Sequence, residues 1–158
     1  MIEAEVAPAS ADFSDWDALH RLLTDAFSAL EDRIDPPSSL HRMTADDLRQ
    51  KARGEHLVLA RVGNGLAGCA FGGIDGDALY LSKLAVAPEW QRRGILRRMI
   101  GLLEAEAHGR GLRALTLQTR VELTENHATF RALGFKKTQE TAHPGYRRAT
   151  SFTFRKTI

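Results

Sequence analysis

The chain has 158 residues, a length sufficient for one domain with a hydrophobic core. Its composition, 43% hydrophobic and 27% charged, is typical of a globular protein, and a formal net charge of +2 is too small to indicate a nucleic-acid ligand. No apolar run reaches the ~18 residues of a membrane span, and the N-terminus is acidic rather than an apolar signal core. We therefore expect a cytoplasmic protein without nucleic-acid or membrane partners.

Residues with redox or metal chemistry are sparse. The single cysteine, Cys69, excludes an intrachain disulfide, and its apolar neighbours predict a small buried residue rather than a nucleophile. The six histidines show neither an HExxH pattern nor paired Cys/His spacing, so we expect no metal site.

The N-terminal part predicts a strand followed by a helix. Residues 2–7 are expected to form the strand, and Ser14 or Asp15 is placed to cap the helix. The apolar residues of this helix recur at helical spacing, at Trp16, Leu19, Leu22, Leu23, Ala26, Phe27 and Leu30. The proline-containing segment 35–39 must then be a loop, because proline interrupts helical hydrogen bonding.

After this loop the sequence predicts a short helix and a three-stranded meander. Thr44 followed by Asp47 resembles a capping box for a helix over 45–53. Strand-like segments follow at 56–62, 66–74 and 78–86. The first two are joined by Gly63-Asn64-Gly65, which predicts a type I′ hairpin turn.

The C-terminal half alternates helices and strands. The expected segments are a helix at 94–109, a strand at 114–118, a helix at 125–133 capped by Thr124, and strands at 136–141 and 149–155. The strand at 114–118 is expected to run parallel to 78–86, because a helical crossover joins the two. The last two strands are expected to pair antiparallel.

The segment from Leu84 to Arg97 carries the most specific signal in the chain. It has the pattern of a buried strand, a proline-broken turn, and a basic glycine turn, Gln91-Arg92-Arg93-Gly94, that opens a helix. The first N–H groups of a helix lack intrahelical partners, and with the helix dipole they form an anion site. Gly94 lets a ligand approach the backbone closely. The pattern therefore predicts a site for a polyanion such as a pyrophosphate.

Two motifs resemble a known superfamily. Gln91-Arg92-Arg93-Gly94 resembles the acyl-CoA signature of the GNAT N-acetyltransferases, Q/R-x-x-G-x-G/A, with Leu96 where the family usually has Gly or Ala. The segment from Asn126 to Phe130, followed by Ala132-Leu133-Gly134-Phe135, resembles the family's closing helix and Gly-Phe turn. The resemblance implies an α/β (α+β) GNAT fold over a single domain, 1–158. That fold has a mixed, mostly antiparallel sheet of six to seven strands with a splayed central parallel pair, flanked by about four helices.

The resemblance also implies acetyl-CoA as the cosubstrate, no metal, and direct attack by a small-molecule or peptide amine in a ternary complex. CoA would enter the gap between the splayed strands, and a homodimer is left open. The residues implied for CoA binding are Leu84, Ala85, Val86, Gln91, Arg92, Arg93, Gly94, Ile95, Leu96, Arg97, Asn126 and Phe130.

The general acid and base are less evident. Phe130 stands where family members often have a tyrosine acid, and Tyr80 where some have a glutamate base. Three explanations stay open: protons pass through water and other side chains, catalysis rests on positioning, or the protein binds acyl-CoA without transfer. Strand alternation places Tyr80 and Ser82 on one side, so both are catalytic candidates, with core packing as the alternative for Tyr80. His127 is expected to be exposed rather than a proton relay.

The resemblance also implies that two loops form the acceptor side. One carries Glu31, Asp32 and Asp35 beside two prolines, and its carboxylates would bind a cationic amine. The other, 143–148, carries Tyr146 as a candidate proton donor. The alternative for each is a solvated surface loop.

Overall fold

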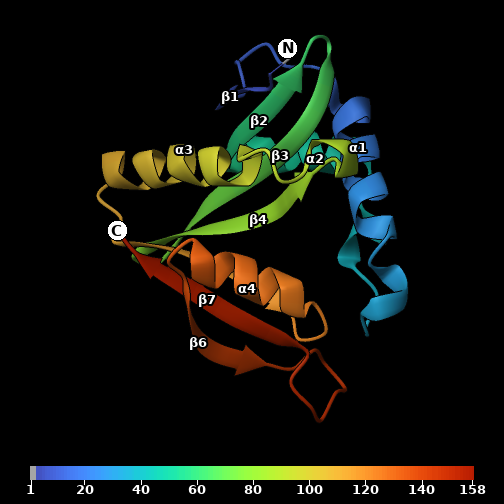
Figure 1. The fold of residues 1–158 in the computed structure, drawn as a ribbon, viewed down its shortest axis with the longest axis vertical. Helices are drawn as coiled ribbons and strands as arrows, with labels where there is room; N and C mark the ends of the chain where they lie inside the picture. The colour runs from blue at the N-terminus through green and yellow to red at the C-terminus, as the bar shows by residue number, and fades with distance from the viewer. Residues whose placement is uncertain (1–2) are drawn as a thin grey trace.

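The computed structural model describes residues 3–158, in which a seven-stranded sheet is covered by four α-helices (Figure 1). The strands are β1 (Glu5–Pro8), β2 (His56–Val62), β3 (Gly65–Asp75), β4 (Ala78–Val86), β5 (Ala114–Arg120), β6 (Lys136–Thr141) and β7 (Ser151–Thr157). The α-helices are α1 (Trp16–Ser28), α2 (Ala45–Gly54), α3 (Ile95–Gly109) and α4 (Thr124–Ala132), and the 3-10 turns are η1 (Glu31–Arg33), η2 (Ser39–Arg42) and η3 (Pro88–Trp90). The strand expected at 2–7 begins at Glu5, and residue 2 lies outside the described residues. Within 3–158, no helix has the length and hydropathy to cross a bilayer.

The strand order is β1-β2-β3-β4-β5-β7-β6. β2, β3 and β4 form the predicted antiparallel meander, and β7 pairs antiparallel with both β5 and β6. β4 and β5 are parallel, and α3 makes the crossover between them. The fold class predicted from the sequence is therefore confirmed: a mixed, mostly antiparallel sheet with a central parallel pair and four flanking helices.

The parallel pair separates partway along its length. β4 and β5 pair from Ala78 with Ala114 to Leu81 with Leu117. β4 nevertheless continues to Val86 and β5 to Arg120. Beyond Leu81, β4 remains paired with β3 through a register shift, so its other backbone edge is left without the β5 ladder.

Opposite faces of the sheet are covered by separate hydrophobic clusters. α3 and α4 lie on one face, where Leu103 belongs to a cluster with Leu79 and Leu115 (Figure 1). α1 and α2 cover the other face, where Leu23 belongs to a cluster with Phe71. All five side chains are fully buried, and each contributes about 2 kcal/mol by leaving water. The two layers hold the sheet rigid on both sides of the point where β4 and β5 separate.

Two of the three predicted helix caps are present. Thr44 and Asp47 form the reciprocal capping box, and Asp15 accepts a backbone N–H at the start of α1. The cap predicted at Thr124 is wrong, because Thr124 is already the first residue of α4. The N–H of Asn126 bonds to the carbonyl of residue 123 over 3.0 Å, so helical bonding begins one residue earlier than the cap rule expects.

The β2–β3 hairpin differs from the predicted type I′ turn. Its two connecting residues are Gly63 and Asn64, since β2 ends before them and β3 begins after them. Of these two, only Gly63 has a positive φ, +58°. A type I′ turn needs positive φ at both central residues, so that prediction is wrong. Glycine at the first position is the pattern of a type II′ turn.

Candidate active site

The turn before α3 has the backbone geometry of an anion-binding nest. Arg92 and Gly94 have left-handed φ values of +64° and +81°, with Arg93 between them. Such alternation turns successive N–H groups toward one side. No side chain caps α3, and among the described residues no backbone partner is recorded for the N–H groups of Arg92 or Gly94. A Cβ on Gly94 would meet nothing within 4 Å, so the turn is open to a ligand.

Two side chains of the turn are used in structural contacts. Gln91 Nε2 donates to the carbonyl of Val86 over 3.3 Å, which fastens the turn to the end of β4. The guanidinium of Arg93 lies 4.6 Å from the centre of the Trp90 ring, a cation–π contact. The sequence could predict the positive charge of this segment but not which of its side chains fold back onto the protein.

The remaining residues predicted at the anion site divide between core and solvent. Ile95 is buried and Leu96 packs against the same α3-face cluster. Arg92 and Arg97 are exposed. The larger side chain at Leu96, which departs from the family signature, is therefore accommodated against the core.

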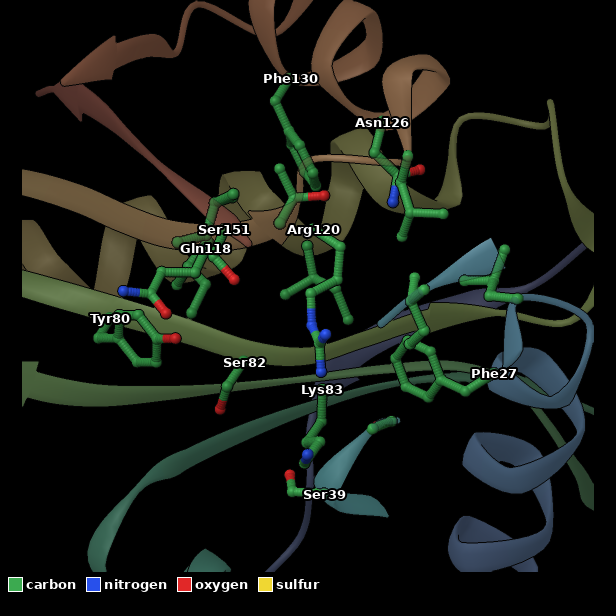
Figure 2. A pocket seen from close by; sticks show the side chains of 18 of the residues that line it. Phe27, Ser39, Tyr80, Ser82, Lys83, Gln118, Arg120, Asn126, Phe130 and Ser151 are labelled. Atoms are coloured by element: carbon green, nitrogen blue, oxygen red, sulfur yellow. The ribbon is translucent and has the colours of Figure 1, made fainter. Parts of the chain in front are cut away.

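A cavity of about 290 Å³ lies where β4 and β5 separate (Figure 2). It is lined by residues 80–84 of β4 and 117–120 of β5. Asn126 and Phe130 close it from α4, and Phe27 from α1. The structure therefore brings both splayed strands and both predicted α4 residues into one site.

The segment of β4 predicted to bind CoA, Leu84 to Val86, leads from this cavity to the nest. Leu84 lines the cavity, Ala85 is buried in the cluster on the α1 face, and Val86 pairs with Gly68 of β3. Because β3 occupies only one edge of β4, the other edge keeps backbone groups available to a ligand.

Tyr80 and Ser82 both line the cavity, as strand alternation predicts. Burial, with smaller effects from Asp75 and Glu55, raises the pKa of the Tyr80 hydroxyl, so this group is protonated at neutral pH. Ser82 Oγ is buried without a recorded hydrogen-bond partner among the described residues. The two hydroxyls are therefore placed to donate hydrogen bonds to a bound molecule.

α4 presents an apolar surface to the cavity. Phe130 is 8% exposed and packs edge-on against Phe135, with ring centres 5.8 Å apart, and close to Phe154. His127 is also buried, and its Nε2 donates to the Arg120 carbonyl over 2.9 Å. The expectation of an exposed His127 is wrong, because α4 turns this side chain toward β7 rather than toward solvent.

Two cations in the cavity were missed by the sequence analysis. Lys83 has a left-handed φ of +51° at the register shift between β3 and β4, which carries its side chain out of the regular alternation. Burial, then the nearby Lys51, lowers the pKa of Lys83. Arg120, at the end of β5, donates to the carbonyls of Pro36 and Pro37 over 2.6 and 3.3 Å. Alternation along β5 could have identified Arg120, but no sequence signal marked the bulge at Lys83.

The predicted acidic acceptor loop reaches the cavity without its carboxylates. The cavity is lined instead by Leu30, Ile34, Ser38 and Ser39 of this segment. Three predicted substrate-binding residues are absent from the lining of the described cavity, namely Glu31, Asp32 and Asp35. Glu31 instead contacts His41. The described cavity therefore does not bring these carboxylates together with Tyr80 and Ser82, and their binding of an amine stays a prediction.

Asp35 and Tyr146 bind each other outside the cavity. The Tyr146 hydroxyl donates to Asp35 Oδ1 over 2.5 Å, and Arg148 donates to Asp35 Oδ2 over 3.2 Å. The bond to Asp35 raises the pKa of Tyr146. Tyr146 does not line the cavity, so the structure does not bring it together with Tyr80 and Ser82.

Comparisons with known proteins agree with this geometry. A sequence model of the acetyltransferase (GNAT) family matches residues 16–135, more than half of the chain. The chain therefore belongs to the GNAT acetyltransferase family, which confirms the resemblance found in the two sequence motifs.

Two curated relatives are acetyltransferases. Mycothiol acetyltransferase of Thermobifida fusca (strain YX) is 37% identical over 110 residues, covering 60% of this chain and 34% of that protein. Aminoglycoside N(6')-acetyltransferase type 1 of Stenotrophomonas maltophilia is 33% identical over 64 residues, covering 40% of this chain and 42% of that protein. The chain thus spans less than half the length of either relative.

Solved structures show the same fold. The PaiA N-acetyltransferase of Thermoplasma acidophilum, solved in complex with coenzyme A, superposes with a TM-score of 0.82 at 14% identity and covers 99% of each chain. At that identity the likeness concerns the fold alone.

Proposed function

We propose that the protein is an N-acyltransferase that moves an acetyl group from acetyl-CoA to an amine in a ternary complex, acting as one domain. One observation carries the proposal: β4 leads directly from the cavity at 80–84 to the nest at Arg92 and Gly94. Acetyl-CoA has a polyanionic end and a reactive thioester end, and β4 connects a site that suits each of them. The proposed location is the cytoplasm, as the sequence predicts.

The residues present fit CoA. The free N–H groups of the nest and of the first turn of α3, with exposed Arg92 and Arg97, suit phosphate oxygens. The edge of β4 without the β5 ladder suits the amides of a pantetheine arm, which would add to β4 as an extended strand does. When bound, acetyl-CoA supplies an acetyl group activated as a thioester.

The proposed reaction forms a bond from the amine nitrogen to the thioester carbonyl carbon and breaks the carbon–sulfur bond. The nitrogen loses one proton and the sulfur gains one. Tyr80 is the proposed proton donor, because burial keeps its hydroxyl protonated at neutral pH. Ser82 Oγ is proposed to bond the reacting groups, because it has no partner recorded within residues 3–158.

Steady-state kinetics tests the proposal. Purified protein is mixed with acetyl-CoA and a panel of amines, and the free thiol of CoA is measured with a thiol reagent. We expect amine-dependent thiol release with sequential kinetics, because a ternary complex forms no acetylated enzyme. The Tyr80→Phe variant should lower kcat while the KM for acetyl-CoA stays unchanged.

The alternative, a protein that binds acyl-CoA without transfer, rests on Phe130 and Tyr80 standing where the usual acid and base would be. Tight acetyl-CoA binding by calorimetry with no amine-dependent thiol release would favour this alternative. Parallel double-reciprocal lines would instead show a covalent intermediate and overturn direct attack.

A further inference from the structure

The charged side chains that line the cavity between the splayed strands are positive. Arg120 and Lys83 line it from the two splayed strands, and among residues 3–158 no aspartate or glutamate lines it (Figure 2). Neither cation makes a recorded ion pair with a carboxylate of the described chain. We propose that the acceptor amine also carries a carboxylate, which Arg120 and Lys83 hold while the amine reacts. This inference rests on the proposed transfer activity.

The nearby carboxylates are bound to other cations. Asp35 and Glu122 both contact Arg148, at 3.2 and 3.8 Å. Glu55, which lies near Lys83, pairs with Lys51 at 2.7 Å. One arginine thus faces two carboxylates, and both of these carboxylates also favour the charged form of Arg120. None of the three carboxylates lines the cavity itself, where the charged side chains are Arg120 and Lys83.

Arg120 is positioned for this role by the backbone. The carbonyls of Pro36 and Pro37 hold one N–H of each terminal nitrogen, and a guanidinium has five N–H donors in a fixed plane. Three donors therefore remain, enough for a carboxylate. The groups that anchor the side chain are neutral carbonyls, and the nearby Glu122 and Asp35 favour its charged form without making an ion pair with it.

The apolar wall of the cavity places a second requirement on the acceptor. Phe27 in the last turn of α1, Leu30 just after that helix, and Ile34 form an apolar wall of the same cavity. Tyr80 and Gln118 stand on the strands opposite, as Figure 2 shows for the labelled side chains. An acceptor that fits carries an amine, a carboxylate and an apolar group, which is the composition of an apolar α-amino acid.

Matched amines test this inference. Phenylalanine and phenethylamine differ by the carboxylate alone, as do leucine and isopentylamine, and a diamine represents the cationic class. The phosphonate analogue of phenylalanine distinguishes a carboxylate from a phosphate-like anion. We expect kcat/KM at least about tenfold higher for each carboxylated member, which corresponds to the tenfold step of a single charged contact. The phosphonate should react more slowly than the carboxylate.

Variants of Arg120 and Lys83 test whether these two cations cause the preference for carboxylated amines. Arg120→Gln and Lys83→Gln should each reduce the preference for the carboxylated member severalfold, through its KM, with the KM for acetyl-CoA unchanged. Arg120→Lys keeps the charge and should keep most of the preference. Arg21→Gln, the same change at an exposed arginine of α1, is the matched control. Thermal melting of each variant checks that it is folded.

Calorimetry with the amines in the presence of CoA separates the two proposals. Tighter binding of carboxylated amines to the wild type than to Arg120→Gln, without turnover, supports the anion site and refutes the transfer activity. Turnover that is equal for both members of a pair, or faster for the diamine, overturns the inference and leaves the transfer activity intact. Equal binding of all amines in the absence of turnover overturns it as well.

Discussion

A bulky residue at Gly94, in the nest before α3, is expected to weaken CoA binding while the protein remains folded. Gly94 has a φ of +81°, and a Cβ there would meet nothing within 4 Å. In Gly94→Trp the left-handed backbone costs about 1–2 kcal/mol of stability. For a chain of 158 residues we expect the melting temperature to fall by about 2–8 °C, so the variant remains folded. Its indole would occupy the space into which the free N–H groups open.

The same substitution at Gly76 is the matched control. Gly76 has a φ of +60°, also has nothing within 4 Å, and lies in the turn before β4, at the opposite end of that strand from Gly94. Gly76→Trp should lose similar stability and keep its affinity for CoA. Gly94→Trp should lose CoA affinity by about tenfold or more, because hydrogen bonds to charged phosphates are worth about 1.5–3 kcal/mol each. Calorimetric titration with CoA measures the difference, and unchanged affinity in a folded Gly94→Trp refutes the nest as the phosphate site.

Two further predictions concern α4. Phe130→Ala removes a ring that is 8% exposed and should destabilise the fold by about 3–5 kcal/mol, with kcat nearly unchanged in the fraction that remains folded; a large kcat loss with an unchanged melt would show a direct catalytic role. Arg33 holds Glu125 by a hydrogen bond that lowers the Glu125 pKa to about 2, so its stabilising effect is complete above the ordinary pKa of 4.5 and is lost as pH falls toward 2. The melting temperatures of wild type and Glu125→Gln should therefore differ at pH 6 and converge near pH 2, and a constant difference would contradict the assignment.

The parts of the fold that the sequence predicts depend on neighbours in the chain. The capping box of Thr44 and Asp47 forms between residues three apart, and the nest at Arg92 and Gly94 follows from a basic glycine turn at a helix start. The parallel pairing of β4 with β5 follows from the helix between them. The capping box and the nest are formed by local interactions, whereas the β4–β5 pairing joins distant residues but follows from a general rule for strands connected by a helix.

The candidate site was harder to predict because distant contacts determine it. Asp35 was expected to face the acceptor, but Tyr146, 111 residues away, binds it outside the cavity. Lys83 enters the cavity because a bulge changes its side, and the bulge becomes apparent only when β3 and β4 are paired. His127 is buried because α4 packs its polar N-terminal turn against β7. In each case the local sequence pattern does not identify the distant residue that determines where the side chain lies.

The charge of the cavity also affects how the proposed reaction handles protons. A carboxylate beside the bound amine would favour its protonated, unreactive form, whereas the positive charges of Arg120 and Lys83 disfavour a second cation and lower the pKa of an amine between them. In the proposed complex two cations face one carboxylate, so the net charge favours the neutral amine. At the other end of the transfer, burial raises the pKa of Tyr80 and keeps a proton available in the cavity. In the proposed function, the residues that bind a carboxylated acceptor would thus also reduce the need for a separate general base.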